Sequence, residues 1–272
     1  MICFPNAKIN LGLNVVSKRP DGYHNIETIF YPIPVKDALE IVASDQPSFT
    51  GTGIPVDAPQ EKNLVIKALN ALETRYEIPP LEIHLLKAIP FGAGLGGGSA
   101  DAAFMLKLLN EHYNLQLSDN QLEDYAATLG ADCAFFIKNT PTYAEGIGNI
   151  FSPIELSLKG YRIMIVKPDV FVSTREAFAN IRPHRPEYPV REVIRRPVAE
   201  WKDTLINDFE ASVFPQYPVI GEIKEELYHQ GAIYASMSGS GSSVFGLFAA
   251  GTTLPEIDWG TNAFCFKGTL SE

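Results

Sequence analysis

The chain contains few cysteines, and they stand far apart. Its 272 residues include only three, Cys3, Cys133 and Cys265. No C-x-x-C pair or cysteine–histidine spacing is present, so the sequence supports neither a zinc site nor a disulfide framework. Unpaired cysteines are typical of a reducing compartment, and we expect a cytoplasmic protein.

Long hydrophobic runs are also missing. No apolar stretch approaches the roughly 18 residues that a membrane-spanning helix needs. At the N-terminus, Pro5, Asn6, Lys8 and Asn10 interrupt the apolar core that a signal peptide requires. We therefore expect a soluble intracellular protein without a membrane partner.

Positive charge is in the minority. Lysine and arginine number 22 against 32 aspartate and glutamate residues, which gives a formal net charge of −10. This balance argues against nucleic acid or an anionic membrane as the main partner. A small anionic ligand remains possible, because backbone N–H groups bind phosphate without net positive charge.

The composition is that of a folded protein, with 46% hydrophobic and 20% charged residues. The length suits one large domain or two small ones. Strands mixed with helices, without regular βαβα alternation, favour an α+β fold in two subdomains, 1–152 and 153–272. The stretch 44–59 is rich in proline and glycine and predicts a surface hairpin or loop. Hydrophobic periodicity predicts strands over 7–16, 26–33, 38–43, 81–87 and 161–168, helices over 63–76, 100–113, 119–129, 174–181, 199–208 and 218–230, and a strand–turn–strand over 236–249.

Two helix starts have side-chain signals. Ser99 stands where the N-cap of the helix over 100–113 belongs. Ser118 with Gln121 forms a capping box for the helix over 119–129, which Gly130 closes.

The stretch FGAGLGGGSA, residues 91–100, is the most informative one. Five glycines in seven residues permit close approach of a ligand to the backbone, and the following helix offers its N-terminal N–H groups to an anion. A plain turn needs only one or two glycines. A Walker loop is excluded, because no lysine precedes Ser99. The dinucleotide pattern matches at Gly92, Gly94 and Gly97, but a second helix follows where that fold has a strand.

PFGAGLGGGSADAA resembles the second motif of the GHMP kinases, a family that includes galactokinase, homoserine kinase and mevalonate kinase. AKINL (7–11) resembles the first motif, and SMSGSGSSVFG (236–246) resembles the third. The similarity spans residues 5 to about 248. It implies a two-subdomain α+β fold with a cleft between an N-terminal nucleotide and catalytic domain and a C-terminal substrate domain.

The resemblance also implies which residues bind ATP. The third motif is expected to pack near the nucleotide loop through Ser238, Gly239, Ser240 and Gly241. The loop residues implied to surround the triphosphate are Pro90, Phe91, Gly92, Ala93, Gly94, Leu95, Gly96, Gly97, Gly98, Ser99 and Ala100.

Lys8 and Asp132 are the implied catalytic pair. Asp132 would accept the proton of a substrate hydroxyl, and Lys8 would stabilise charge on the attacking oxygen. Taken from the residues alone, Lys8 also fits a solvated lysine at a strand end. Asp132 also fits a helix N-cap after Gly130.

KRPDGYHNIETIF (18–30), LGADCAFFI (129–137) and AEGIGN (144–149) are most similar to a family member whose alcohol substrate carries a cytidine diphosphate group. Tyr23 and His24 would then stack on the cytosine, although a plain pair of strand-edge aromatics is the alternative. Asn10 would bind the alcohol end or orient Lys8. Ser173 and Thr174 would line the substrate side, and Ser173 also fits an N-cap.

Magnesium is expected as Mg-ATP, with no dedicated protein metal site. Ser99 would contact a phosphate oxygen or the magnesium ion. The Arg- and Pro-rich segment 182–197 fits a solvated lid or loop better than a diphosphate contact. The remaining alternatives are a homoserine- or mevalonate-type kinase, a catalytically silent nucleotide-binding protein and a glycine-rich scaffold. We expect a monomer or a weak homodimer.

Overall fold

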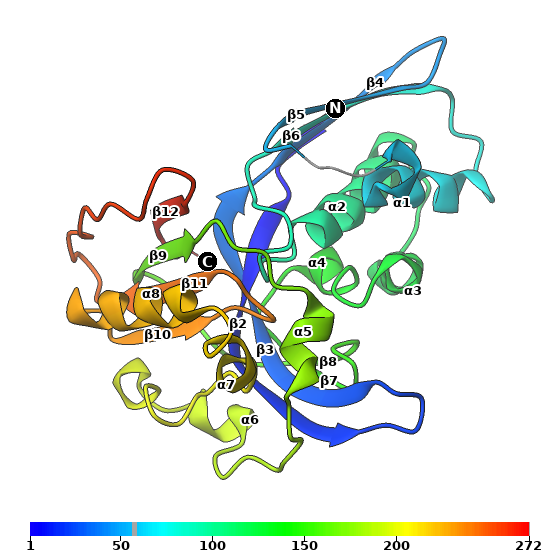
Figure 1. The fold of residues 1–272 in the computed structure, drawn as a ribbon. Coiled ribbons are helices and arrows are strands. Elements are labelled where there is room, and N and C mark those ends of the chain that lie inside the picture. The colour runs from blue at the N-terminus through cyan, green and yellow to red at the C-terminus, as the bar shows by residue number, and fades with distance from the viewer. Residues whose placement is uncertain (56–58, 272) are drawn as a thin grey trace. The chain divides into compact units, whose positions relative to one another are not determined.

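Strands and helices are mixed along the chain in the computed structural model, which describes residues 1–55 and 59–271 (Figure 1). The predicted α+β class is confirmed. The structure divides into two units that interleave in sequence. The predicted domains 1–152 and 153–272 divide the chain at one point, whereas each of these units combines separate segments of the chain. The first unit comprises 1–7, 35–91 and 96–140, and the second comprises 8–34, 92–95 and 141–272.

A four-stranded sheet organises the first unit. Strand β6 (Leu81–Lys87) pairs antiparallel with β4 (Ala38–Ala43) and parallel with β5 (Ser48–Gly53), while β1 (Ile2–Cys3) pairs with β4. In β6 the alternate residues Leu81, Ile83 and Leu85 are buried, as their period of two predicts.

Four α-helices complete the first unit: α1 (Leu64–Glu73), α2 (Gly97–His112), α3 (Asp119–Leu129) and α4 (Phe135–Lys138), with a short 3-10 turn at Gln60–Lys62. Helix α2 packs against the other three (Figure 1). The predicted capping box of α3 is confirmed, because Ser118 Oγ accepts from Gln121 N and Gln121 Oε1 accepts from Ser118 N at 3.0 Å.

Helix α2 begins three residues earlier than predicted. Gly96 occupies the N-cap position with φ +71°, and Ser99 lies inside the first turn, so the predicted N-cap role of Ser99 is wrong. A Cβ on Gly97 would lie 2.7 Å from Ile89 Cγ2. The missing side chain therefore lets the helix start close to the end of β6, where serine would not fit.

Two four-stranded sheets organise the second unit. Strand β2 (Asn6–Lys18) leads one sheet in the order β2-β3-β7-β8, with β3 (His24–Lys36), β7 (Thr142–Glu145) and β8 (Ile150–Pro153). The other sheet has the order β10-β11-β9-β12, made of β10 (Tyr234–Met237), β11 (Val244–Phe248), β9 (Arg162–Lys167) and β12 (Phe264–Thr269). Its strands pair antiparallel throughout.

Helices of the second unit are shorter. Helix α8 (Pro218–His229) packs on β10 and β11 and buries Ile220, Ile223 and Leu227. The remaining helices are α5 (Thr174–Ala179), α6 (Val190–Val193) and α7 (Phe209–Val213), with a 3-10 turn at Val198–Glu200. The capping box of α5, Ser173 with Glu176, supports the predicted N-cap role of Ser173.

Two further predictions from the sequence are wrong. The surface hairpin or loop expected over 44–59 contains strand β5, which pairs parallel with β6 and not in a hairpin, and whose exposed residues give no alternating apolar signal. Residues 56–58 lie outside the described part of the chain. The expected helix over 199–208 is absent apart from the 3-10 turn. There the backbone bonds to β2 instead, through Leu13 N to Ile206 O and Asp208 N to Leu13 O.

Within the described residues, no helix is both long enough and apolar enough to cross a lipid bilayer.

Candidate active site

Lys8 lies on β2 and is only 3% exposed. Its ammonium donates to Asn10 Oδ1 at 2.6 Å and to the carbonyl of Gly94 at 3.0 Å, and it lies 4.9 Å from the centre of the Phe30 ring. A buried ammonium is costly unless such partners surround it. The interpretation of Lys8 as a solvated strand-end lysine is therefore wrong.

Asn10 is fixed by the same network. Its Nδ2 donates to Thr28 Oγ1 at 3.0 Å while its Oδ1 accepts from Lys8, and the residue is 2% exposed. Residues two apart on a strand share a face, which brings Asn10 beside Lys8. This geometry supports the predicted orienting role better than a direct substrate contact.

The third motif meets the glycine loop within the second unit. Ser238 Oγ donates to the Gly94 carbonyl at 2.8 Å, and Asn10 N donates to Ser238 Oγ at 3.2 Å. A Cβ at Gly94, whose φ is +74°, would lie 1.9 Å from the carbonyl oxygen of Ser238. Only glycine permits this approach. The predicted proximity of loop and third motif holds for Gly94 and Ser238.

The rest of the glycine stretch starts helix α2 in the first unit. No side chain caps the N-terminus of this sixteen-residue helix, so its first backbone N–H groups are not bonded by a cap. Uncapped N–H groups together with the helix dipole favour an anion. Phe91 is largely exposed, while Pro90 and Ala100 are buried.

Asp132 lies in a turn between α3 and α4 in the first unit. Helix α4 starts at Phe135 with Ala134 at its N-cap position, so the N-cap interpretation of Asp132 is wrong. Burial raises the pKa of the neighbouring Cys133 thiol to about 11, so this cysteine is not a reactive thiolate. The Ser99 side chain acts in the opposite direction and lowers the pKa of this thiol, so this turn lies beside the first turn of α2.

A buried ion triad lies under the start of α2. Lys87 pairs with Asp37 and with Asp101 Oδ2, the latter at 2.7 Å. Asp37 Oδ1 also accepts from the backbone N–H groups of Ala88 and Ile89. All three side chains are buried. The triad therefore ties the ends of β3 and β6 to the helix that begins at Gly97.

Two aromatic rings stack at the start of β3. The imidazole of His24 and the ring of Phe178 are 4.8 Å apart at their centres and nearly parallel, and Phe209 supports Phe178 edge-on. Burial and Lys18 lower the pKa of His24, which leaves a neutral ring at physiological pH. Tyr23 is 63% exposed. His24 and Phe178 thus offer a flat apolar platform.

Thr174 opens helix α5 and faces the third motif. Its Oγ1 lies 3.5 Å from Ser240 Oγ. Gly92 approaches the neighbouring loop closely, since a Cβ on it would lie 2.5 Å from the ring of Phe171. The structure thus brings the predicted residue Thr174 to the third motif.

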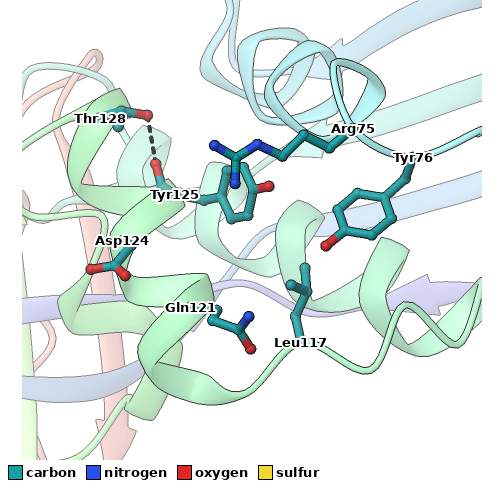
Figure 2. A pocket seen from close by; sticks show the side chains of 7 residues that line it. All are labelled: Arg75, Tyr76, Leu117, Gln121, Asp124, Tyr125 and Thr128. Carbon is teal, nitrogen blue, oxygen red and sulfur yellow. Dashed lines mark hydrogen bonds between the residues drawn. The ribbon is translucent and has the colours of Figure 1, made fainter.

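A cavity of about 330 Å³ lies elsewhere in the first unit, beside α3 (Figure 2). The guanidinium of Arg75 lies 5.8 Å from the ring centre of Tyr125 in it. Its lining residues are Arg75, Tyr76, Leu117, Gln121, Asp124, Tyr125 and Thr128. None of them belongs to a predicted motif, so we give this cavity no part in the reaction.

Over residues 1–55 and 59–271, no three His, Cys, Asp or Glu side chains are grouped as metal ligands. Sequence reasoning missed Thr28, Phe178 and the Lys87 triad. Phe178 lies within the helix predicted after Ser173, which is a weak signal. The triad leaves no signal in the sequence, because its three residues are separated along the chain and charged residues are usually exposed.

Two family models match the chain. The model of the GHMP kinases N terminal domain matches residues 63–139, and that of the GHMP kinases C terminal matches residues 191–256.

Relatives match over most of the chain or all of it. A relative named 4-diphosphocytidyl-2-C-methyl-D-erythritol kinase, from Bacteroides thetaiotaomicron, is 69% identical over 99% of this chain and 100% of its own. The crystal structure of a 4-(cytidine 5'-diphospho)-2C-methyl-D-erythritol kinase has a TM-score of 0.79 at 31% identity, over 91% of this chain and 90% of that one. The Methanococcus jannaschii mevalonate kinase shares the fold, with a TM-score of 0.70 at 14% identity over 100% of this chain and 98% of that one. The motifs, the fold and these relatives together show that the chain belongs to the GHMP kinases, a family of ATP-dependent kinases.

Proposed function

We propose that this chain transfers the γ-phosphate of ATP to the 2-hydroxyl of 4-diphosphocytidyl-2-C-methyl-D-erythritol, a step of the non-mevalonate route to isoprenoids. The observation that carries the proposal is the 69% identity, from end to end, with a relative of that name. The buried Lys8 and the stacked His24 and Phe178 support it independently.

The reaction needs a base and charge stabilisation. The substrate oxygen forms a bond to the γ-phosphorus, the bond from that phosphorus to the ADP oxygen breaks, and the hydroxyl proton passes to Asp132. Lys8 stabilises the charge that develops on the attacking oxygen. Its bonds to Asn10 and Gly94 support this role, because they hold the ammonium in one place without reorganisation.

ATP is proposed to lie with its phosphates at the glycine stretch. The uncapped start of α2 supports this, because a phosphate satisfies N–H groups that no side chain occupies. Magnesium is proposed to enter as Mg-ATP, neutralising charge on the transferred phosphoryl group. Phosphate oxygens would supply most of its ligands, since the described residues hold no carboxylate cluster for it. Ser99, in the first turn of α2, would contact a phosphate oxygen or this ion.

The cytosine of the substrate is proposed to stack on the aromatic pair. His24 and Phe178 form the platform, and the exposed Tyr23 lies beside it in sequence. Base stacking on aromatic side chains tolerates small changes in geometry, so this site would bind the cytidine diphosphate end. Thr174, close to Ser240, would line the substrate side.

The protein is proposed to act in the cytoplasm as a monomer or weak homodimer on a small-molecule substrate, cytidine diphosphate-linked methylerythritol, with no nucleic acid partner. The three free cysteines support the compartment.

An acceptor panel tests the function. ADP release is measured with Mg-ATP and one of four acceptors: the cytidine diphosphate-linked substrate, methylerythritol 4-phosphate, homoserine or mevalonate. Turnover with the first alone is expected. Turnover with homoserine or mevalonate would keep the family and overturn the substrate. Absence of turnover with all four, despite ATP binding, would favour a silent binding protein.

Replacing His24 by alanine tests the stacking platform. Loss of one stacked base typically costs about 1–3 kcal/mol, so we expect kcat/KM for the cytidine-linked substrate to fall by roughly 5- to 150-fold. The KM for ATP should stay near the wild-type value. His229→Ala, at the exposed end of α8, serves as the matched control. Equal kinetics of both variants would contradict cytosine stacking at His24.

A further inference from the structure

We infer that Asn207 is a positioning residue for Lys8: its side chain holds the glycine-rich third motif, which in turn holds the acceptors of the Lys8 ammonium. The inference rests on the role proposed for Lys8 above. It concerns residues of the second unit only. Asn207 falls where the sequence predicted a helix, and none of the motifs includes it.

The Asn207 side chain is buried and satisfied by backbone groups. It is 1% exposed. Its Nδ2 donates to the carbonyl of Met237 at 2.7 Å and to that of Gly239 at 2.9 Å, while its Oδ1 accepts from Phe209 N at 3.0 Å. One amide thus uses both of its N–H donors on the third motif, on either side of Ser238.

The backbone around Asn207 is itself anchored to strand β2, which carries Lys8. Leu13 N donates to Ile206 O at 2.9 Å, and Asp208 N donates to Leu13 O at 2.8 Å. Asp208 Oδ2 accepts from Val15 N at 2.7 Å. The segment therefore does not move independently of β2. Asn207 fixes the third motif relative to the same strand that holds the lysine.

Ser238 continues the connection from Asn207 to the ammonium. The carbonyl groups on either side of it are the two that Asn207 holds. Its hydroxyl donates to Gly94 O and accepts from Asn10 N. Gly94 O and Asn10 Oδ1 both accept from Lys8 Nζ. A displacement of the third motif thus reaches two groups that accept from the ammonium.

A second buried side chain, Glu210, also holds strand β10 through the backbone of Met237. Glu210 Oε1 accepts from Met237 N at 2.9 Å and from Ser236 Oγ at 3.1 Å, and its Oε2 pairs with Lys224 at 2.5 Å. Glu210 therefore anchors the first two residues of the motif, at the end of β10. Asn207 alone of the two reaches Gly239, beyond Ser238, so the two roles can be separated by mutation.

The experiment compares Asn207→Ala with a matched variant, Tyr234→Phe. Tyr234 is equally buried, and its hydroxyl donates to Leu205 O at 2.8 Å. This bond joins the same two stretches of chain but touches neither Met237 nor Gly239. Both variants lose buried hydrogen bonding, so their melting temperatures should fall. Only Asn207→Ala should lower kcat, by about 10- to 100-fold, with the KM of the alcohol substrate changed by less than about threefold.

Asn207→Asp adds a readout that a merely structural role would not move. An ionised carboxylate would face two carbonyl oxygens and repel them, whereas a protonated one donates to one of them. We expect its kcat to fall as pH rises, more steeply than that of the wild type. A matching loss of melting temperature with pH-independent kcat would overturn the inference.

Lys8→Met in the same assay separates the two proposals. If Lys8→Met abolishes turnover while Asn207→Ala keeps kcat within about twofold of Tyr234→Phe, the positioning role fails and the proposed function stands. If Lys8→Met turns over normally, the role of Lys8 fails, and the positioning inference falls with it.

Discussion

Asp132→Ala should lower turnover by about 10²- to 10⁴-fold, the range that a general base contributes. The variant loses the proposed acceptor for the hydroxyl proton, while the glycine stretch and the start of α2 are unchanged. ATP affinity, measured by calorimetry, should therefore stay within about threefold of the wild type. Because Asp132 caps no helix, its removal costs no N-cap interaction of α4.

Asp124→Ala provides the control for this prediction. Asp124 is an exposed aspartate on α3 in the same unit, so it matches the change in charge. The Asp124→Ala variant should have the same turnover rate as the wild type. Near-normal turnover of Asp132→Ala would refute the assignment of Asp132 as the base. Loss of both turnover and ATP affinity would instead indicate a role in nucleotide binding.

Lys87→Met should be the most destabilising single substitution considered for the first unit. It leaves Asp37 and Asp101 buried without their shared cation, and breaking a buried ion pair from one side typically costs about 3–5 kcal/mol. The exposed Lys62→Met should cost little. Thermal unfolding followed by circular dichroism, with kinase activity as a second readout, measures the difference.

The loss in Lys87→Met should depend on pH. Burial raises the pKa of Asp101 to about 7, while Lys87 acts in the opposite direction. A carboxyl with a raised folded-state pKa destabilises the fold as pH rises above its unfolded value of about 3.9. Without Lys87 this effect should grow, so the cost of the substitution should be larger at pH 8 than at pH 5.

A double variant checks the physical cause. Lys87→Met combined with Asp101→Asn removes one of the two uncompensated carboxylates and should recover part of the lost melting temperature. It should also flatten the pH dependence. A double variant no more stable than Lys87→Met at pH 8 would mean that lost packing, not buried charge, explains the cost.

Elements with a local signal were predictable from the sequence. Ser118 with Gln121 marks the start of α3, and the alternation of Leu81, Ile83 and Leu85 marks β6, since both signals depend only on near neighbours. Strand β5 has no such signal. Its backbone pairing with β6, which is distant in sequence, makes this segment a strand. The stretch 199–208 has Trp201 and Leu205 at helical spacing, but tertiary bonds to β2 override that preference.

The candidate site divides in the same way. The glycine stretch and Lys8 could be found through their motifs, because the proposed chemistry depends directly on those residue types. The environment of Lys8 could not. Thr28 and Asn207 act through buried bonds to segments far away in sequence, and polar residues of these types usually lie at the surface. Only the fold shows that they face inward.

The interleaving of the two units also sets an order for folding during synthesis. The first unit is complete once residue 140 has been made, but the second combines residues 8–34 with 141–272. Leu13 and Val15 of β2 belong to a core with residues as late as Leu254. Translation proceeds at about 5–20 residues per second. The apolar side chains of β2 therefore lack their core partners during most of the time in which the chain is synthesised. We therefore expect a ribosome-associated chaperone to bind the nascent β2–β3 stretch until the C-terminal residues have been made.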